Sequence, residues 1–172
     1  MSETEIKNTA KIMSFLAWIF GLMLLTYFIG IWEENQVNPN KAPETSSVNN
    51  KHQVVLQQNR IGHYLVNGTI NHTAATFLLD TGATDVVIPG QLASNYKLVE
   101  NGYKQTITAN GIITVAQTSI EVISIGDINL YNVRASINPG MQKNQEVLLG
   151  MSALKQLELT QINQSLTLTQ YD

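Results

Sequence analysis

A run of twenty uncharged residues near the start of the chain, MSFLAWIFGLMLLTYFIGIW at positions 13–32, constrains the fold more than any other feature. At a rise of about 1.5 Å per residue, a helix of this length matches a hydrocarbon core about 30 Å thick. A helix buried in a domain core usually has a shorter apolar run and one polar side. The run therefore predicts a transmembrane anchor helix at 13–32, preceded by a short tail.

The residues around this run indicate an uncleaved anchor and its orientation. Its last residues, 28–32, lack the small side chains of a signal-peptidase site. Lys7 and Lys11 precede the run, whereas Glu33 and Glu34 follow it. Because cytoplasmic flanks carry the excess of Lys and Arg, we expect the tail, 1–12, to be cytoplasmic. The rest of the chain would then lie on the outer, periplasmic or extracytoplasmic, face of the inner membrane.

The remaining sequence divides by composition into a linker and a β domain. Residues 33–52 are rich in Asn, Pro, Ser and charge, which predicts a flexible linker. Residues 53–172 have short runs of Val, Ile, Leu, Thr and Tyr between Gly, Asn and Asp, as in all-β domains. Strands are predicted at 54–58, 63–70, 73–79, 85–88, 103–108, 112–125, 128–137, 146–149 and 165–170, and a short helix at 151–158.

Tight turns are predicted where Asn, Asp and Gly tolerate a positive φ. These are Asn71-His72, residues 109–111 and Gly126-Asp127, with Asn67-Gly68 as a competing turn. The β domain carries six Lys and Arg against eight Asp and Glu, so it has no basic surface to attract nucleic acid. The chain has no Cys, and its three His residues lack a metal-binding spacing, so no metal or other cofactor is expected.

The segment 77–89, FLLDTGATDVVIP, carries the chemistry. An apolar strand runs into a short polar turn at Asp80 and resumes as an apolar strand. Asp80 can accept or donate a proton, Thr81 offers a hydroxyl to a neighbouring backbone, and Gly82 allows close approach of another chain. Two carboxylates held side by side share one proton and can act as base and acid together. A turn that only links two strands is the structural alternative.

The motif F-L-L-D-T-G-A-T, followed downstream by Leu148-Leu149-Gly150, resembles the retropepsin-like aspartic proteases, and within them the bacterial, single-span, membrane-anchored branch. The resemblance covers about residues 61–170. It implies an all-β, closed barrel of mostly antiparallel strands, one acid-protease lobe in size. It also implies that Asp80 is catalytic, that residues 81–83 and 148–150 support its loop, and that 103–118 is a flap hairpin. The flap tip would bind substrate through Ala109, Asn110 and Gly111.

Two departures shape the expected assembly. Met151 stands where retroviral members carry Arg, so the contacts between subunits would differ in detail. The chain has one D-T-G, whereas two-lobed members have two, so a homodimer must supply the second Asp80. No other carboxylate lies in such a motif, and Asp85, Glu121 and Asp127 are predicted to be solvated surface residues.

The function expected from the resemblance is a membrane-anchored aspartic endopeptidase that acts on a protein or peptide substrate. The main alternative is a catalytically inactive domain of the same fold that binds a peptide or protein partner. A structural β domain tethered to the membrane explains the apolar run but leaves the D-T-G motif unexplained. A serine hydrolase is disfavoured because Gly150-Met151-Ser152 is not followed by the x-G of a nucleophile elbow.

Overall fold

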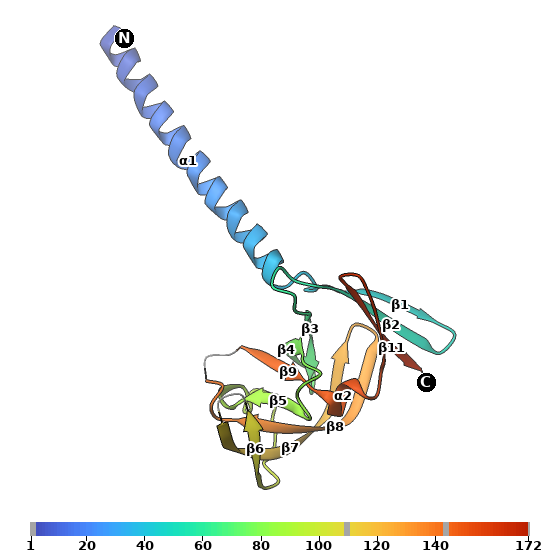
Figure 1. Ribbon diagram of the computed structural model, residues 1–172. Helices are drawn as coiled ribbons and strands as arrows, with labels where there is room; N and C mark the ends of the chain where they lie inside the picture. The colour runs from blue at the N-terminus through green and yellow to red at the C-terminus, as the bar shows by residue number, and fades with distance from the viewer. Residues whose placement is uncertain (1–2, 109–110, 143–144, 172) are drawn as a thin grey trace. The chain divides into compact units, whose positions relative to one another are not determined.

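The computed structural model describes residues 3–108, 111–142 and 145–171. These residues form two compact units, Met1–Val37 and Asn38–Asp172. The first unit is one helix, α1 (Glu3–Val37), drawn in blue in Figure 1. Its part Lys11–Val37 contains an 18-residue window with a mean hydropathy of 2.1 and is long and apolar enough to cross a membrane. The helix thus extends beyond 13–32 at both ends and takes in the first residues of the predicted linker.

In its described residues, the second unit has eleven strands and two short helical segments. Every strand predicted from the sequence is present, with ends shifted by two or three residues at most. The strands are β1 (Glu44–Val48), β2 (Lys51–Gln57), β3 (Leu65–Ile70), β4 (Thr73–Leu79), β5 (Val86–Pro89), β6 (Tyr103–Thr108), β7 (Gly111–Ile125), β8 (Ile128–Asn138), β9 (Glu146–Leu149), β10 (Glu158–Ile162) and β11 (Ser165–Tyr171). The helical segments are η1 (Gly90–Leu92) and α2 (Met151–Leu154).

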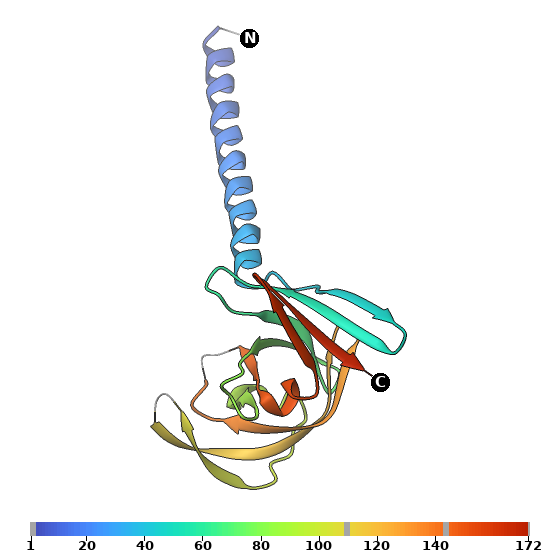
Figure 2. The same cartoon turned by 45° about the vertical axis from the view of Figure 1, so that its right-hand side comes forward.

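Seven strands form one sheet in the order β3-β4-β9-β5-β8-β7-β6. The sheet closes on itself because β3 also pairs with β7, which places Thr69 opposite Ser124 and Ile70 opposite Ile123. Figure 2 shows the curved sheet, from which β6 and the start of β7 project as a hairpin. The fold is therefore the closed, mostly antiparallel barrel that was expected. Its interior holds fully buried side chains that include Phe77, Ile70, Ile88, Ile120, Ile123, Ile125, Leu130 and Leu149.

A glycine allows the barrel to close. A Cβ at Gly68 would lie 2.2 Å from the backbone oxygen of Ser124, so a larger residue would push β3 and β7 apart. Asn67-Gly68 accordingly lies inside β3 and is not a turn. The chain turns instead at Asn71-His72, where both residues have positive φ, at 47° and 65°.

Four strands form a second sheet in the order β1-β2-β11-β10. Its edge strands β1 and β10 were not predicted. Both are exposed along their whole length, so neither has the apolar alternation that marks a half-buried strand. Strand β10 begins at Glu158, and the predicted helix 151–158 is helical only as far as Leu154. Asn49 and Asn50, with positive φ, form the turn that joins β1 to β2.

Part of the predicted flexible linker, 33–52, is therefore ordered. Asn38 and Asn40 are buried, and their side chains hydrogen-bond to the barrel and to the second sheet. The Asn40 amide donates to the backbone oxygens of Gln57 at 2.9 Å and Leu65 at 2.6 Å, and it accepts from the Gln57 N–H at 2.7 Å. Asn38 donates to the Asn67 side chain at 2.9 Å. These polar anchors replace the apolar contacts that the segment lacks.

Candidate active site

The end of β4 places Asp80 at one edge of the barrel. Strands β4 and β9 run parallel, with Leu79 opposite Leu149, so both strands end at the same edge. The backbone N–H of Asp80 donates to the Leu149 oxygen at 3.2 Å, which extends the pairing by one residue. The residues that follow these strands, Asp80 and Gly150, are consequently brought together by the sheet register.

Residues 80–85 form a tight turn, here called the aspartate loop. The N–H of Gly82 donates to Asp80 Oδ1 at 2.8 Å, and the N–H of Ala83 donates to the Asp80 backbone oxygen at 3.2 Å. These bonds hold a half-buried carboxylate in a fixed orientation. Thr81 is exposed, and among the described residues its hydroxyl has no hydrogen-bond partner. The expected bond from this hydroxyl to a neighbouring backbone group is therefore absent from the part of the chain that the structure describes.

The start of α2 supports the aspartate loop from below. The N–H of Met151 donates to the Ala83 oxygen at 2.8 Å, and the N–H of Ser152 donates to the Thr84 oxygen at 2.9 Å. A Cβ at Gly150 would lie 2.1 Å from the nearest backbone oxygen of the loop, so only glycine fits without displacing it. The structure therefore brings Leu149 and Gly150 against the aspartate loop, while Leu148 pairs with Leu78 and Val87 and lines the cavity.

The prediction that Asp85 is a solvated surface residue was wrong. Asp85 is buried, with 3% of its side chain exposed, and its carboxylate lies between two cations. Arg134 Nε on β8 donates to Asp85 Oδ1 at 2.6 Å, and Lys104 Nζ on β6 donates to Asp85 Oδ2. Glu121 and Asp127, predicted in the same way, are exposed. Asp85 was missed because its partners lie 19 and 49 residues further along the chain, where spacing gives no signal.

The surroundings of Asp85 act on its pKa in opposite directions. Burial raises the pKa of this carboxyl, because desolvation disfavours the charged form. Hydrogen bonds and charges from Lys104 and Arg134 more than offset that effect, so the pKa lies below its ordinary value. Asp85 is therefore an ionised anchor that joins the aspartate loop to β6 and β8.

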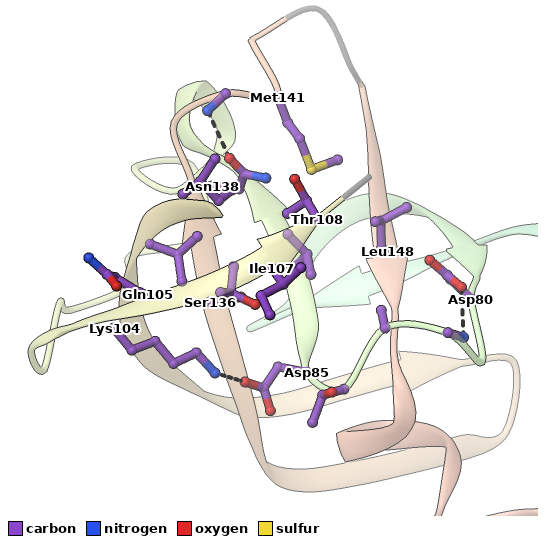
Figure 3. Close-up of a pocket in the computed structure, with 18 residues that line it drawn as sticks. Asp80, Asp85, Lys104, Gln105, Ile107, Thr108, Ser136, Asn138, Met141 and Leu148 are labelled. Carbon is purple, nitrogen blue, oxygen red and sulfur yellow. Dashed lines mark hydrogen bonds and ion pairs between the residues drawn. The ribbon is translucent and has the colours of Figure 1, made fainter. Parts of the chain in front are cut away.

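The β6–β7 hairpin and the aspartate loop enclose a cavity of about 740 Å³. Figure 3 shows the cavity with Asp80 on one side, Lys104 and Gln105 of β6 on the other, and Ile107 between them. The hairpin agrees with the flap expected at 103–118. Of the expected flap-tip residues, Ala109 and Asn110 lie outside the described residues, and Gly111 is the exposed first residue of β7 with a φ of 108°.

Of the residues that the structure describes, the charged ones that line the cavity are Asp80, Asp85 and Lys104. Asp85 is paired with two cations, whereas the Asp80 carboxylate accepts a hydrogen bond from a backbone N–H. Asp80 is thus the carboxylate whose setting suits proton transfer to a molecule in the cavity. Within the described part of the chain, no cluster of three or more His, Asp or Glu side chains could hold a metal ion.

The sequence matches a known family model over the part that carries this site. The model described as gag-polyprotein putative aspartyl protease matches residues 66–156. That range includes β4, the aspartate loop, the β6–β7 hairpin and Gly150.

Two curated bacterial relatives share sequence with the chain, and both are described as uncharacterized. One, from Sinorhizobium sp and encoded in the cobV 5′ region, is 31% identical over 127 residues. The other, from Rickettsia prowazekii (strain Madrid E), is 27% identical over 123 residues. The alignments cover 72% and 69% of this chain but 54% and 52% of the relatives. The chain thus spans about half the length of the curated relatives it matches.

A solved structure has the same fold. The crystal structure of a retropepsin-like aspartic protease from Rickettsia conorii superimposes with a TM-score of 0.58 and 23% sequence identity. The match covers 74% of this chain and 94% of that one. At this identity the likeness concerns the architecture of the β domain.

Proposed function

The chain belongs to the retropepsin-like aspartic protease family, and on this basis we propose that it is an aspartic endopeptidase in which Asp80 is catalytic. The observation that carries the proposal is the setting of Asp80. Its carboxylate follows a buried strand, is oriented by the Gly82 N–H at 2.8 Å, and lines a cavity of about 740 Å³ beneath a hairpin. A turn that only linked two strands would need neither an oriented carboxylate nor a cavity.

The working enzyme in this proposal is a homodimer. Peptide hydrolysis by an aspartic dyad needs two facing carboxylates, and the chain has one D-T-G motif. Asp85 cannot take the second role within one subunit, because Arg134 and Lys104 hold it as an ion-paired carboxylate. The exposed Thr81 and Gly82 leave the aspartate loop accessible to the same loop of a second copy.

Catalysis would follow from two Asp80 carboxyl groups that share one proton. The ionised member takes a proton from a water molecule, which attacks the scissile carbonyl, while the protonated member hydrogen-bonds the carbonyl oxygen. Substrate would bind as an extended strand between the hairpin and the aspartate loop, with alternate side chains directed to opposite sides. Residues 81–83 and 148–150 would hold the loop, and the hairpin tip at 109–111 would close over the peptide.

The helix α1 is the proposed membrane anchor, through residues 13–32. Its length and apolar composition support this role, and Lys7 and Lys11 support a cytoplasmic N-terminus. The protease domain would then lie on the periplasmic or extracytoplasmic side of the inner membrane.

The alternative of an inactive peptide-binding domain is disfavoured by the site itself. A binding groove has no need of an oriented carboxylate at the point where two copies would meet, because facing carboxylates repel unless they share a proton. The intact D-T-G and the bond from Gly82 to Asp80 therefore favour the enzyme.

Peptide cleavage by the full chain in detergent tests the catalytic proposal. The wild-type protein should cleave members of a peptide library, and Asp80→Asn should cleave none, although it keeps the size and the hydrogen-bond acceptor of the side chain. Glu121→Gln, which changes an exposed carboxylate outside the cavity, is the matched control. Equal turnover by wild type and Asp80→Asn would exclude Asp80 as the catalytic residue.

Mixing of subunits tests the dimer. When wild-type and Asp80→Asn subunits exchange freely in equal amounts at saturating concentration, random pairing lowers the activity per wild-type subunit to about half. Independent subunits would keep their full activity in the mixture. Catalysis by a single chain would therefore be revealed by an unchanged specific activity.

Single cysteines test the orientation, because the chain has no Cys of its own. In intact spheroplasts a membrane-impermeant maleimide should label Glu121→Cys, which is exposed on the β domain. It should label Thr4→Cys in the N-terminal tail only after lysis. The reverse pattern would place the β domain in the cytoplasm.

A further inference from the structure

At the side of the cavity away from Asp80, a cluster of three charged side chains carries a net positive charge, although one of them, Arg134, does not line the cavity. Two cations, Lys104 and Arg134, converge on one buried carboxylate, Asp85. The three charges sum to about one positive unit. Among the described residues, Asp80 is the remaining charged residue that lines the cavity.

Of the two cations, Lys104 is the one placed to meet a bound peptide. Lys104 lines the cavity, and a third of its side chain is exposed. In Figure 3 its side chain runs from β6 toward Asp85, along the part of the cavity opposite Asp80. An ammonium group has three N–H donors, and Asp85 is the one acceptor that the described residues provide for it. Arg134 is not among the lining residues, and it meets Asp85 from β8.

We propose that Lys104 is a specificity-determining residue that selects substrates with an acidic side chain near the cleaved bond. This inference rests on the proposed protease function and names a preference of the same site. A substrate carboxylate beside Lys104 would complete a set of two cations and two anions and would accept a charge-assisted hydrogen bond. Asp85 acts as a positioning residue, because it fixes the ammonium group at the cavity wall.

The same geometry disfavours basic substrate side chains at this position. Asp85 already accepts from two cations, and a third would add repulsion without a free carboxylate to offset it. A neutral side chain of equal size, such as Gln for Glu, would keep the packing but lose the ionic hydrogen bond. The comparison of Glu with Gln in otherwise identical peptides therefore isolates the interaction.

Matched peptides provide the test. A peptide that the full chain cleaves is remade with Glu, Gln or Lys at each position flanking the cleaved bond, and kcat/KM is measured above about pH 5, where Glu is ionised. At one position, Glu should be preferred over Gln by about tenfold, the size expected for a hydrogen bond to a charged group. Lys should be the poorest of the three at that position.

Variants of Lys104 assign the preference to this residue. Lys104→Met should bring the Glu-to-Gln ratio close to one, whereas Lys104→Arg should retain the preference. Arg134 still pairs with Asp85 in both variants, which keeps the buried carboxylate compensated. Lys155→Met, which removes an exposed Lys remote from the lining residues, is the control and should leave the ratio unchanged.

Each outcome is decisive. A preference for Glu that is lost in Lys104→Met and kept in Lys104→Arg supports the inference. Cleavage with equal kcat/KM for Glu and Gln at every position, or a preference for Lys, overturns it while leaving the protease function intact. A preference for Glu that persists in Lys104→Met also overturns it. No cleavage of any peptide would refute the proposed function itself.

Discussion

The two carboxylates of the aspartate loop lie five residues apart and have opposite surroundings. Asp80 is half-buried, accepts a hydrogen bond from the Gly82 N–H and faces a cavity. Asp85 is buried and held by Arg134 and Lys104. One short turn therefore contains the carboxylate for which we propose proton transfer and an ion-paired carboxylate that fixes the loop.

This difference shows how a polar turn can hold a candidate reactive carboxylate in a defined position. The loop is fixed at its far end by Asp85, and from below by the start of α2 and by Gly150. Asp80, the first residue of the loop, can then keep its position with a backbone hydrogen bond to its carboxylate in place of ion pairs. The comparison predicts that changes at Asp80 alter activity and that changes at Asp85 alter stability.

The largest expected effect is on catalysis at Asp80. Asp80→Asn should lower kcat by about 10³-fold or more, because an amide cannot exchange the proton that the reaction needs. Its free energy of unfolding should stay within about 0.5 kcal/mol of wild type, because the amide oxygen can still accept from the Gly82 N–H. Chemical denaturation and peptide hydrolysis on the same preparation measure both. A large loss of stability would mean that Asp80 is also structural.

Gly150→Ala should disturb both carboxylates at once. The new Cβ would lie 2.1 Å from a backbone oxygen of the loop, so the loop or α2 must shift. We expect a loss of about 3 kcal/mol in the free energy of unfolding, together with a fall in activity. Gly21→Ala, where a Cβ meets nothing within 4 Å, is the control. A stable and active Gly150→Ala would show that the loop does not need this close contact.

Asp85→Asn should mainly lower stability. It leaves the charges of Lys104 and Arg134 facing each other without a carboxylate between them. Because both cations are partly exposed, at 33% and 59% of their side chains, we expect a loss of about 2 kcal/mol, less than for a fully buried pair. The measurement is chemical denaturation at neutral pH, with Glu121→Gln as the exposed control. A catalytic loss larger than that of Asp80→Asn would reverse the assignment of the two residues.

The smallest effect is on the pH dependence of stability. The pKa of Asp85 is lowered below 3.8 in the folded protein, so the folded state binds its proton less readily than the unfolded state. Its contribution to stability is therefore complete above pH 3.8 and is lost as the pH falls through the lower, folded pKa. The stability difference between wild type and Asp85→Asn should be constant at higher pH and shrink in that acid range. A difference that grew on acidification would contradict this sign.

Short-range patterns predicted the buried strands, and the family resemblance implied the barrel and the candidate catalytic residue, whose role stays a prediction. Alternating apolar residues marked the buried strands, and the family resemblance carried by the D-T-G-A and L-L-G elements implied which two strand ends meet. The parallel register that places Leu79 beside Leu149 then confirmed that the two elements lie together. In each case the information lies within a few neighbouring residues.

Features that depend on distant partners were not predictable in this way. The ion pairs of Asp85 join three separate elements, and Asn40 reaches 17 and 25 residues along the chain to Gln57 and Leu65. Strands β1 and β10 form at sheet edges by backbone pairing, with no burial to leave an apolar pattern. An Asn-Asn pair at the β1–β2 turn was the one local signal available.

The buried Asn40 belongs to the β domain and lies three residues after the end of α1. In the anchored form that we propose, two copies in the same membrane meet by lateral diffusion. Since both anchors enter the bilayer from the same side, the twofold axis of such a pair must stand along the bilayer normal.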